Sequence, residues 1–248
     1  MHSSPELDLP TRSGGFLSAA DLAVARTPVG AGVIARARYD LDAFDPDLFA
    51  ALGVDRPSRI AGAIAKRQAE FLAGRMMANC AQKALGRAPC PIEIGENRAP
   101  VWPAGLTGSI SHARGFCASI AVPAALGDPG IDIEVIAKGR TLDAILRSAL
   151  SEAEREILNS ASDRKPAGGL ATLCFAAKET LFKALFPTVG RTFGFAAAEL
   201  RSLPSDSQIS LFLTQDLHRD LRAGQGFDIH YELGASEVLT WLVHPRVA

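Results

Sequence analysis

Apolar and polar residues alternate along several short stretches of this 248-residue chain, and apolar residues recur at helical spacing along two longer ones. The alternation predicts strands at residues 32–40, 116–122 and 130–136, with further strands in the C-terminal tail. The helical spacing predicts long helices over residues 57–86 and 170–185. Because helices and strands are mixed without a regular βαβ rhythm, the pattern indicates an α+β fold.

Both halves of the chain contain predicted helices and strands, and the stretch "AALGD" at residues 124–128 is a candidate boundary between them. We therefore expect an N-terminal half of residues 1–125 and a C-terminal half of residues 126–248. Two shorter helices are predicted in the C-terminal half, over residues 142–150 and from Ser151, where a capping box begins.

The predicted strand "GIDIE" carries two carboxylates on one face. Side chains alternate along a strand, so Asp132 and Glu134 point to one side and lie about 7 Å apart. At an effective dielectric near 20, their charges repel by about 2 kcal/mol, and removing either charge should relieve that repulsion. A solvated outer face is the ordinary explanation for such a pair, and a bound cation is the alternative.

The helix over residues 170–185 is apolar on more than one side. Glu179 lies opposite the main stripe, together with three phenylalanines that would be unusual on a solvated face. This indicates a cleft in front of Glu179, and a third carboxylate there would suit Mg²⁺, which prefers oxygen ligands. The alternative is an exposed ion pair between Glu179 and Lys183. The main stripe consists of Leu170, Leu173, Cys174, Ala177, Leu181, Ala184 and Leu185.

Basic residues occur at positions suited to an anionic ligand, although a solvated role is the commoner one for each alone. Arg67 and Arg75 are eight residues apart on the long helix, which places them about 80° apart around its axis. The stretch "GSISH" ends in Ser111 and His112, and its Gly108 would let a ligand approach the backbone closely. Arg98 precedes this stretch, beside prolines and a tryptophan.

Composition narrows the class of protein. The formal net charge of −1 gives no global attraction to nucleic acid or anionic membranes, so an anionic partner would need a local basic cluster. The four cysteines form no C-x-x-C pair and are expected to be reduced packing residues. The N-terminus does not resemble a signal peptide, and no apolar run is long enough to span a bilayer. Together these features predict a cytoplasmic protein.

Four stretches together resemble the 4′-phosphopantetheinyl transferase superfamily, in its monomeric two-halved type that serves siderophore and polyketide synthetases. They are "KRQAEFLAGR", "RAPVWPAGLTGSISH", "GIDIE" and "FAAKETLFKA", in the family's order over about residues 60–190. The resemblance implies transfer of the phosphopantetheine arm of coenzyme A to a serine of an acyl or peptidyl carrier protein, with release of adenosine 3′,5′-bisphosphate. It also implies Mg²⁺ on the coenzyme pyrophosphate, and two similar α+β halves with the coenzyme in the cleft between them.

The resemblance also implies roles for single residues. Asp132, Glu134 and Glu179 match the metal carboxylates, and Lys178 and Lys183 match lysines near the phosphates. A serine hydroxyl must lose a proton as it attacks phosphorus, and Glu179 is the expected acceptor, with Lys183 as the second catalytic residue. One departure is Ala176, where the family usually has a serine or threonine. The coenzyme-contacting set is Arg67, Arg75, Arg98, Ser111 and His112.

Two other functions remain open on the sequence: a metal-dependent phosphodiesterase that uses the same carboxylates with water, and a coenzyme A-binding protein without catalysis. The sequence does not distinguish Mg²⁺ from Mn²⁺ as the metal. Past "GIDIE", the cations Lys138, Arg140 and Arg147 lie close in sequence to the carboxylates. A solvated basic face is the ordinary explanation for them, and a docking edge for an acidic carrier is the alternative.

Overall fold

The structure is a computed structural model that describes residues 13–27, 30–96, 99–160 and 168–246. It combines helices with sheets, as expected for an α+β protein. The chain folds into two compact units, Met1–Pro129 and Gly130–Ala248. None of the described helices is both long and apolar enough to cross a membrane.

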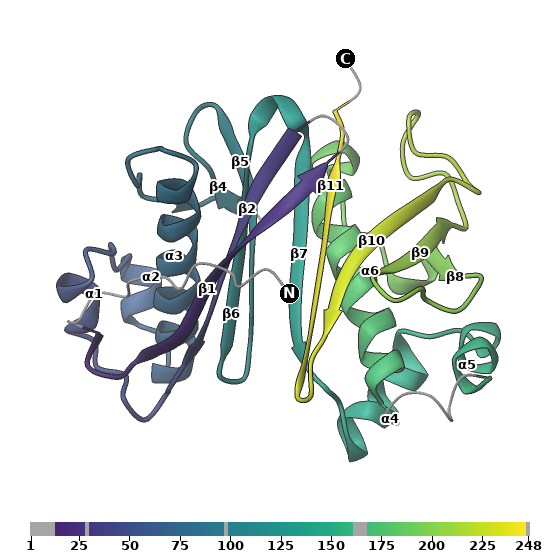
Figure 1. Cartoon of the computed structure of the whole chain (residues 1–248), viewed down its shortest axis with the longest axis horizontal. Helices are drawn as coiled ribbons and strands as arrows, with labels where there is room; N and C mark the ends of the chain where they lie inside the picture. Colours follow the sequence, from purple (N-terminus) through teal and green to yellow (C-terminus); the bar gives the residue numbers. More distant parts are fainter. Residues whose placement is uncertain (1–12, 28–29, 97–98, 161–167, 247–248) are drawn as a thin grey trace. The chain divides into compact units, whose positions relative to one another are not determined.

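The N-terminal unit is a four-stranded antiparallel sheet with one long helix, α3 (Ala65–Ala84), packed along it (Figure 1). Buried side chains between helix and sheet form its core, among them Phe16, Tyr39, Leu72 and Met77. The strands, in spatial order, are β1 (Leu17–Thr27), β2 (Gly30–Tyr39), β6 (Phe116–Pro123) and β5 (Leu106–Ala113). The shorter elements are α1 (Leu48–Ala51), α2 (Ser58–Ala61), the β3–β4 pair (Glu93–Ile94 and Pro100–Val101) and a 3-10 turn at Ala124–Leu126.

The predicted helix over residues 57–86 is two helices, α2 and α3, so its prediction as one element was wrong. Gly62 ends α2, and Ile64 has an extended backbone before α3 begins. The Gln68 side chain donates to the carbonyl oxygens of Ala61 and Ala63, at 3.4 and 2.7 Å. The break is therefore satisfied by a buried side chain that the helical pattern does not reveal.

The C-terminal unit is a five-stranded sheet against which α6 (Gly169–Val189) packs. Its strands, in spatial order, are β7 (Asp128–Val135), β11 (Glu237–His244), β10 (Gly226–Leu233), β9 (Gln208–Leu213) and β8 (Ala198–Leu200). The remaining elements are α4 (Gly139–Ser148), α5 (Glu152–Asn159) and a 3-10 turn at Phe195–Ala197. The capping box predicted at Ser151 is confirmed, with Glu154 as its partner.

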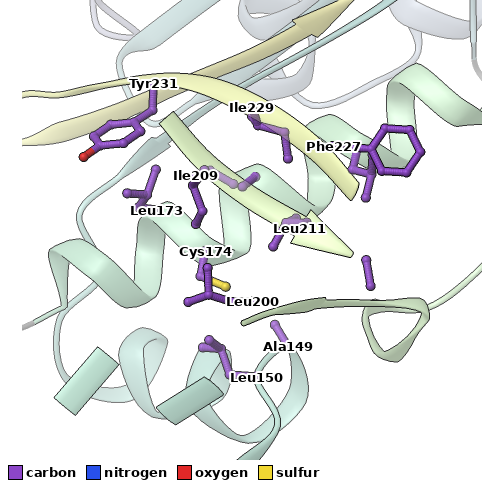
Figure 2. Close-up of a cluster of buried hydrophobic side chains, with 14 of the residues drawn as sticks. Ala149, Leu150, Leu173, Cys174, Leu200, Ile209, Leu211, Phe227, Ile229 and Tyr231 are labelled. Atoms are coloured by element: carbon purple, nitrogen blue, oxygen red, sulfur yellow. The ribbon is translucent and has the colours of Figure 1, made fainter. Parts of the chain in front are cut away.

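The apolar stripe predicted on α6 is confirmed, since all seven of its residues are buried. Leu173 and Cys174 of this stripe lie against Leu200, Ile209 and other side chains of the sheet (Figure 2). The prediction for the cysteines holds for three of the four. Cys90 is exposed, because it lies in the irregular segment after α3 rather than inside an element.

Gly130 determines how closely β7 lies to α6. A Cβ at this position would be 2.0 Å from the carbonyl oxygen of Thr180 and 3.0 Å from the amide nitrogen of Ala184. Only glycine permits this approach, which brings the carboxylates of β7 next to the charged residues of α6.

Candidate functional site

The first cluster lies in the C-terminal unit and is centred on Asp132 of β7. Asp132 is only 3% exposed, so a solvated face is the wrong explanation for this carboxylate. Lys183, on α6, donates from Nζ to Asp132 Oδ1 at 2.7 Å and to the carbonyl oxygen of Ile131 at 2.9 Å. Lys183 therefore pairs with Asp132. The alternative from the sequence, an ion pair between Lys183 and Glu179 along the helix, is not the contact that Lys183 makes.

The three carboxylates share one electrostatic environment. The pKa of Glu134 is raised to about 7, mainly by burial and also by the charges of Asp132 and Glu179, while Lys183 opposes the rise. Burial and the charge of Asp132 likewise raise the pKa of Glu179, again against Lys183. Among the described residues, the ammonium of Lys183 thus faces three carboxylates, and the cluster favours an added proton or cation.

The carboxylates supply the oxygen ligands that Mg²⁺ uses, but as placed they are not a closed ligand set. Among the described residues, no three histidine, cysteine, aspartate or glutamate side chains are grouped closely enough to hold one metal ion. Lys183 also donates a hydrogen bond to Oδ1 of Asp132, an atom that a cation bound at this carboxylate would need. Binding of a metal here would require these side chains to rearrange.

Glu179 lines a pocket of about 270 Å³ within the C-terminal unit. Phe182, which was expected beside it, contacts Phe193 from the segment after the helix, with the ring centroids 5.0 Å apart and the rings tilted. Phe195 lies on the same pocket and contacts Phe175 at 5.5 Å. The pocket is therefore partly aromatic. Phe182 comes from α6, whereas Phe193 and Phe195 come from a segment whose role the helix pattern could not reveal.

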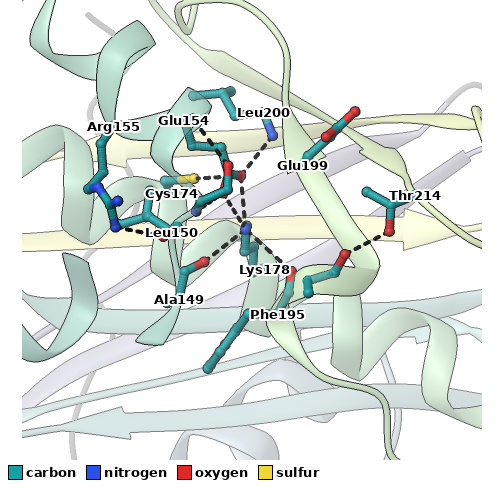
Figure 3. Close-up of polar contacts among 12 residues, drawn as sticks. Ala149, Leu150, Glu154, Arg155, Cys174, Lys178, Phe195, Glu199, Leu200 and Thr214 are labelled. Atoms are coloured by element: carbon teal, nitrogen blue, oxygen red, sulfur yellow. Dashed lines mark hydrogen bonds and ion pairs between the residues drawn. The ribbon is translucent and has the colours of Figure 1, made fainter. Parts of the chain in front are cut away.

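Lys178 has a structural role. Its Nζ is buried and donates to Glu154 and to the carbonyl oxygens of Ala149 and Phe195, at 2.9, 2.8 and 3.3 Å (Figure 3). An ammonium has three hydrogens, and these contacts use them all. The predicted contact between Lys178 and a coenzyme phosphate is therefore not supported by its geometry.

Glu154 is the centre of this buried network, and sequence reasoning assigned it only a helix cap. Its Oε1 accepts from the amide of Leu200 at 2.9 Å, and its Oε2 accepts from the amide of Ser151 at 2.8 Å. The Sγ of Cys174 lies 3.9 Å from Oε1. The pair of Glu154 and Lys178 thus ties α5, α6 and β8 together behind the carboxylate cluster.

The second cluster lies in the N-terminal unit, where α3 faces β5. The guanidinium of Arg67 places Nη1 3.0 Å from Nε2 of His112, so two predicted residues 45 positions apart meet. Glu70 joins them, with Oε2 3.7 Å from His112 Nδ1 and 3.8 Å from Arg67 Nη1. Glu70 is buried and was not predicted as a site residue. The signal in the sequence was its position three residues after Arg67 on the same face.

Arg75 is directed elsewhere. It donates to the carbonyl oxygens of Ile92 and Glu93 at 2.9 and 3.4 Å, and its guanidinium lies 4.5 Å from the ring centroid of Phe71. Burial and the charge of Arg67 lower its pKa to about 10. Arg75 lines a cavity of about 700 Å³ between α3 and the segment before β3.

Only one face of the "GSISH" strand points toward α3. Ile110 packs onto Gly74 of α3, so His112 faces the helix, and the buried Ser111 faces the other side of the sheet. The space beside Gly108 is filled by Trp102, since a Cβ there would be 2.2 Å from the indole ring. The expectation that a ligand would use this space was therefore wrong. Arg98 lies outside the described residues.

Comparison with known proteins gives two family matches. Residues 56–122 match a family described as the 4′-phosphopantetheinyl transferase N-terminal domain. Residues 128–234 match one described as the 4′-phosphopantetheinyl transferase superfamily. The first range contains the Arg67–His112 pair, and the second contains the carboxylates.

Curated relatives agree with these matches. The chain is 37% identical over 147 residues to 4′-phosphopantetheinyl transferase Svp of Streptomyces mobaraensis, covering 59% of each protein. It is 40% identical over 156 residues to enterobactin synthase component D of Salmonella typhi, covering 62% of this chain and 63% of the relative. The similarity thus spans about three fifths of the length of these two relatives.

A third comparison extends further. The chain is 34% identical over 181 residues to enterobactin synthase component D of Escherichia coli O157:H7, covering 72% of this chain and 78% of that protein. Together with the two family matches, this shows that the chain belongs to the 4′-phosphopantetheinyl transferase superfamily.

Proposed function

We propose that this protein transfers the 4′-phosphopantetheine arm of coenzyme A to a serine of an acyl or peptidyl carrier protein and releases adenosine 3′,5′-bisphosphate. The observation that carries the proposal is the cluster of Asp132, Glu134, Glu179 and Lys183, which lies within the superfamily match. The relatives named as components of enterobactin synthase support a carrier from a synthase of that kind.

The reaction forms a bond between the serine Oγ and the phosphorus of phosphopantetheine, and it breaks the bond from that phosphorus to adenosine 3′,5′-bisphosphate. The serine hydroxyl must lose its proton during the attack. Glu179 is the proposed acceptor, because burial and Asp132 raise its pKa and so make it a better base than an exposed carboxylate. Lys183 is the proposed partner of the transferred phosphate, and it must exchange Asp132 for that phosphate.

Mg²⁺ or Mn²⁺ is the proposed cofactor, held by Asp132, Glu134 and Glu179 after Lys183 releases Asp132. The excess of carboxylates over cations and their mutually raised pKa values support this role. When bound, the metal would neutralise charge on the coenzyme pyrophosphate.

Arg67 and His112 are the proposed contacts for the coenzyme phosphates, because the guanidinium of Arg67 on α3 already lies beside the imidazole of His112. Arg75 is proposed for the same ligand, although its guanidinium now bonds to backbone carbonyls. The roles of Ser111 and Arg98 remain predictions, and Lys178 is not part of this proposed set.

We also propose that the two units are similar halves that share one coenzyme cleft. A monomeric state and a cytoplasmic location remain predictions.

The experiment is to incubate the protein with coenzyme A, Mg²⁺ and a panel of apo carrier proteins, and to measure the carriers by mass spectrometry. We expect the mass of phosphopantetheine to be added to at least one carrier. Glu179→Gln should reduce turnover by about 10²- to 10⁴-fold while coenzyme binding is kept. Glu199→Gln is the matched control, because Glu199 lies on β8 in an exposed ion pair with Arg201.

Two outcomes would contradict the proposal. Hydrolysis of coenzyme A without any modified carrier would favour a phosphodiesterase. Coenzyme binding without turnover on the whole panel would favour a protein that binds the coenzyme but has no catalytic role.

A further inference from the structure

The contact between Arg67 and His112 fixes the state of the imidazole. The guanidinium of Arg67 carries only N–H donors, so Nε2 of His112, 3.0 Å away, must present its lone pair. The ring hydrogen is then on Nδ1, and the ring in this contact is neutral. A neutral imidazole with an acceptor at Nε2 cannot donate to a phosphate from that nitrogen.

Glu70 stands at the other nitrogen of the ring. Its Oε2 is 3.7 Å from Nδ1, beyond direct hydrogen bonding but close enough for a strong interaction of charge. The carboxylate is buried, with 11% of its side chain exposed, so solvent screens it only weakly. A negative charge at Nδ1–H holds the hydrogen there and favours a second proton on Nε2.

An anionic phosphate would change which groups face His112. Phosphate forms charge-assisted hydrogen bonds with a guanidinium, and it would compete with Nε2 for Arg67. Once Arg67 turns to the phosphate, Nε2 loses this guanidinium donor and gains an anion as neighbour. With Glu70 on one side and phosphate on the other, the imidazolium becomes the favoured form.

We propose that Glu70 is a positioning residue of the anion site, which prepares His112 to take a proton from solvent when a coenzyme phosphate draws Arg67 away. Binding of the phosphate is thereby coupled to the uptake of one proton. The inference rests on the proposed function, since it assumes that Arg67 and His112 receive a phosphate of coenzyme A.

Among the described residues, the other groups around the ring do not offer an equivalent proton site. Lys66 and Arg67 from α3 contribute positive charge, with Lys66 Nζ 3.8 Å from Glu70, and the exposed Arg114 follows on the chain. Cys117 pairs with His112 across β5 and β6, and burial raises its pKa to about 12. Burial also raises the pKa of Tyr39, whose hydroxyl bonds to the carbonyl of Ala113. Histidine is the side chain here that ordinarily titrates near neutrality.

The proposal and a plain electrostatic role for Glu70 predict opposite changes in coenzyme A affinity when Glu70 is replaced by glutamine. If Glu70 only repels the ligand, Glu70→Gln should tighten binding of an anion at every pH. If Glu70 supports the imidazolium, Glu70→Gln should weaken coenzyme A binding about three- to tenfold above pH 7, because less of the protein is in the binding state. The loss should vanish below about pH 6, where histidine is already protonated.

The experiment is isothermal titration calorimetry of coenzyme A into the full chain, in non-phosphate buffers that differ in ionisation enthalpy. At about pH 7.5 we expect the unmodified protein to take up close to one proton per coenzyme, since histidine is mostly neutral there. Glu70→Gln should take up clearly less, and Glu70→Asp should restore part of the uptake. Lys66→Gln, which removes a charge near the same carboxylate but not at His112, should take up as much as the unmodified protein.

Titration with 3′-dephospho-coenzyme A shows which phosphate is responsible, since a loss of uptake would place the 3′-phosphate at His112. The inference is overturned if the unmodified protein binds coenzyme A without proton uptake, or if Glu70→Gln binds as tightly or more tightly above pH 7. Failure of the proposed function would instead appear as binding that His112→Gln and Arg67→Gln do not affect. Thermal unfolding of each variant checks that it is folded.

Discussion

Two carboxylates that are neighbours on one face of β7 differ because, among the described residues, a lysine pairs directly with only one of them. Asp132 accepts from Lys183 at 2.7 Å, whereas burial and the charge of Asp132 raise the pKa of Glu134 to about 7. A strand pattern presents them as equivalent. The difference comes from a lysine on a helix that begins more than thirty residues later in the chain.

This difference predicts opposite effects on stability without metal. The folded-state pKa of Glu134 lies above its ordinary value of 4.5, so its favourable protonation is present below pH 4.5 and lost as pH rises through about 7. Glu134→Gln should therefore raise the melting temperature at pH 8 and change it little at pH 4.5, measured by thermal unfolding in a chelator. Asp132→Asn should lower the melting temperature at pH 8, contrary to the expectation from repulsion alone, because it weakens the contact with Lys183. Equal shifts for the two variants would contradict this difference.

At the scale of elements, the site depends on how closely α6 approaches β7 and on what fixes α6 from behind. Gly130 permits the close approach of α6, because a Cβ at this position would collide with the backbone of Thr180. The buried ion pair of Glu154 and Lys178 fixes α6 on its other side. The same helix thus carries Lys178 for structure and, on the next positions, Glu179 and Lys183 for the proposed chemistry.

Gly130→Ala tests the approach of helix and strand. A Cβ 2.0 Å from a backbone oxygen forces β7 away, and we expect a loss of about 1 to 3 kcal/mol in the free energy of unfolding, measured with denaturant. Transfer activity should fall as well, because Asp132 moves relative to Lys183. Gly194→Ala is the control, since a Cβ there meets nothing within 4 Å. Similar stability losses in both variants would show that close packing at Gly130 is not the cause.

Lys178→Met separates a structural from a phosphate-binding role. It leaves the carboxylate of Glu154 buried without its ammonium, so the free energy of unfolding should fall by about 3 to 5 kcal/mol. The double variant Glu154→Gln with Lys178→Met should recover part of that loss. Unchanged stability with a raised KM for coenzyme A would return Lys178 to the coenzyme-binding set.

At the scale of the whole molecule, the proposed reaction needs a surface for the carrier protein. Ile145 of α4 and the following Ala149 and Leu150 are buried, so this side of the segment faces inward. Arg140 and Arg147 are exposed on the same segment, which follows β7 and its carboxylates. An acidic carrier would find positive charge here, and this docking edge remains a prediction.

Reversing both charges, Arg140→Glu with Arg147→Glu, should raise the KM for the carrier and leave the KM for coenzyme A nearly unchanged. The effect should be largest at low salt, because charges at the rim of an interface act mainly on association. Arg219→Glu, at a side chain that is 83% exposed in the loop between β9 and β10, is the matched control. An unchanged carrier KM at low salt would place the docking surface elsewhere.

The sequence by itself determined the type and approximate limits of most elements and the inward face of α6, because hydrophobic periodicity records burial directly. It also singled out Asp132, Glu134, Glu179, Arg67 and His112. Only the tertiary structure decided how the charges pair: Lys183 with Asp132, Lys178 with Glu154, and Glu70 with His112. Periodicity shows which way a side chain points, but pairing depends on distances between segments far apart in the chain. Those distances follow from close approaches such as that at Gly130, which a one-dimensional pattern does not contain.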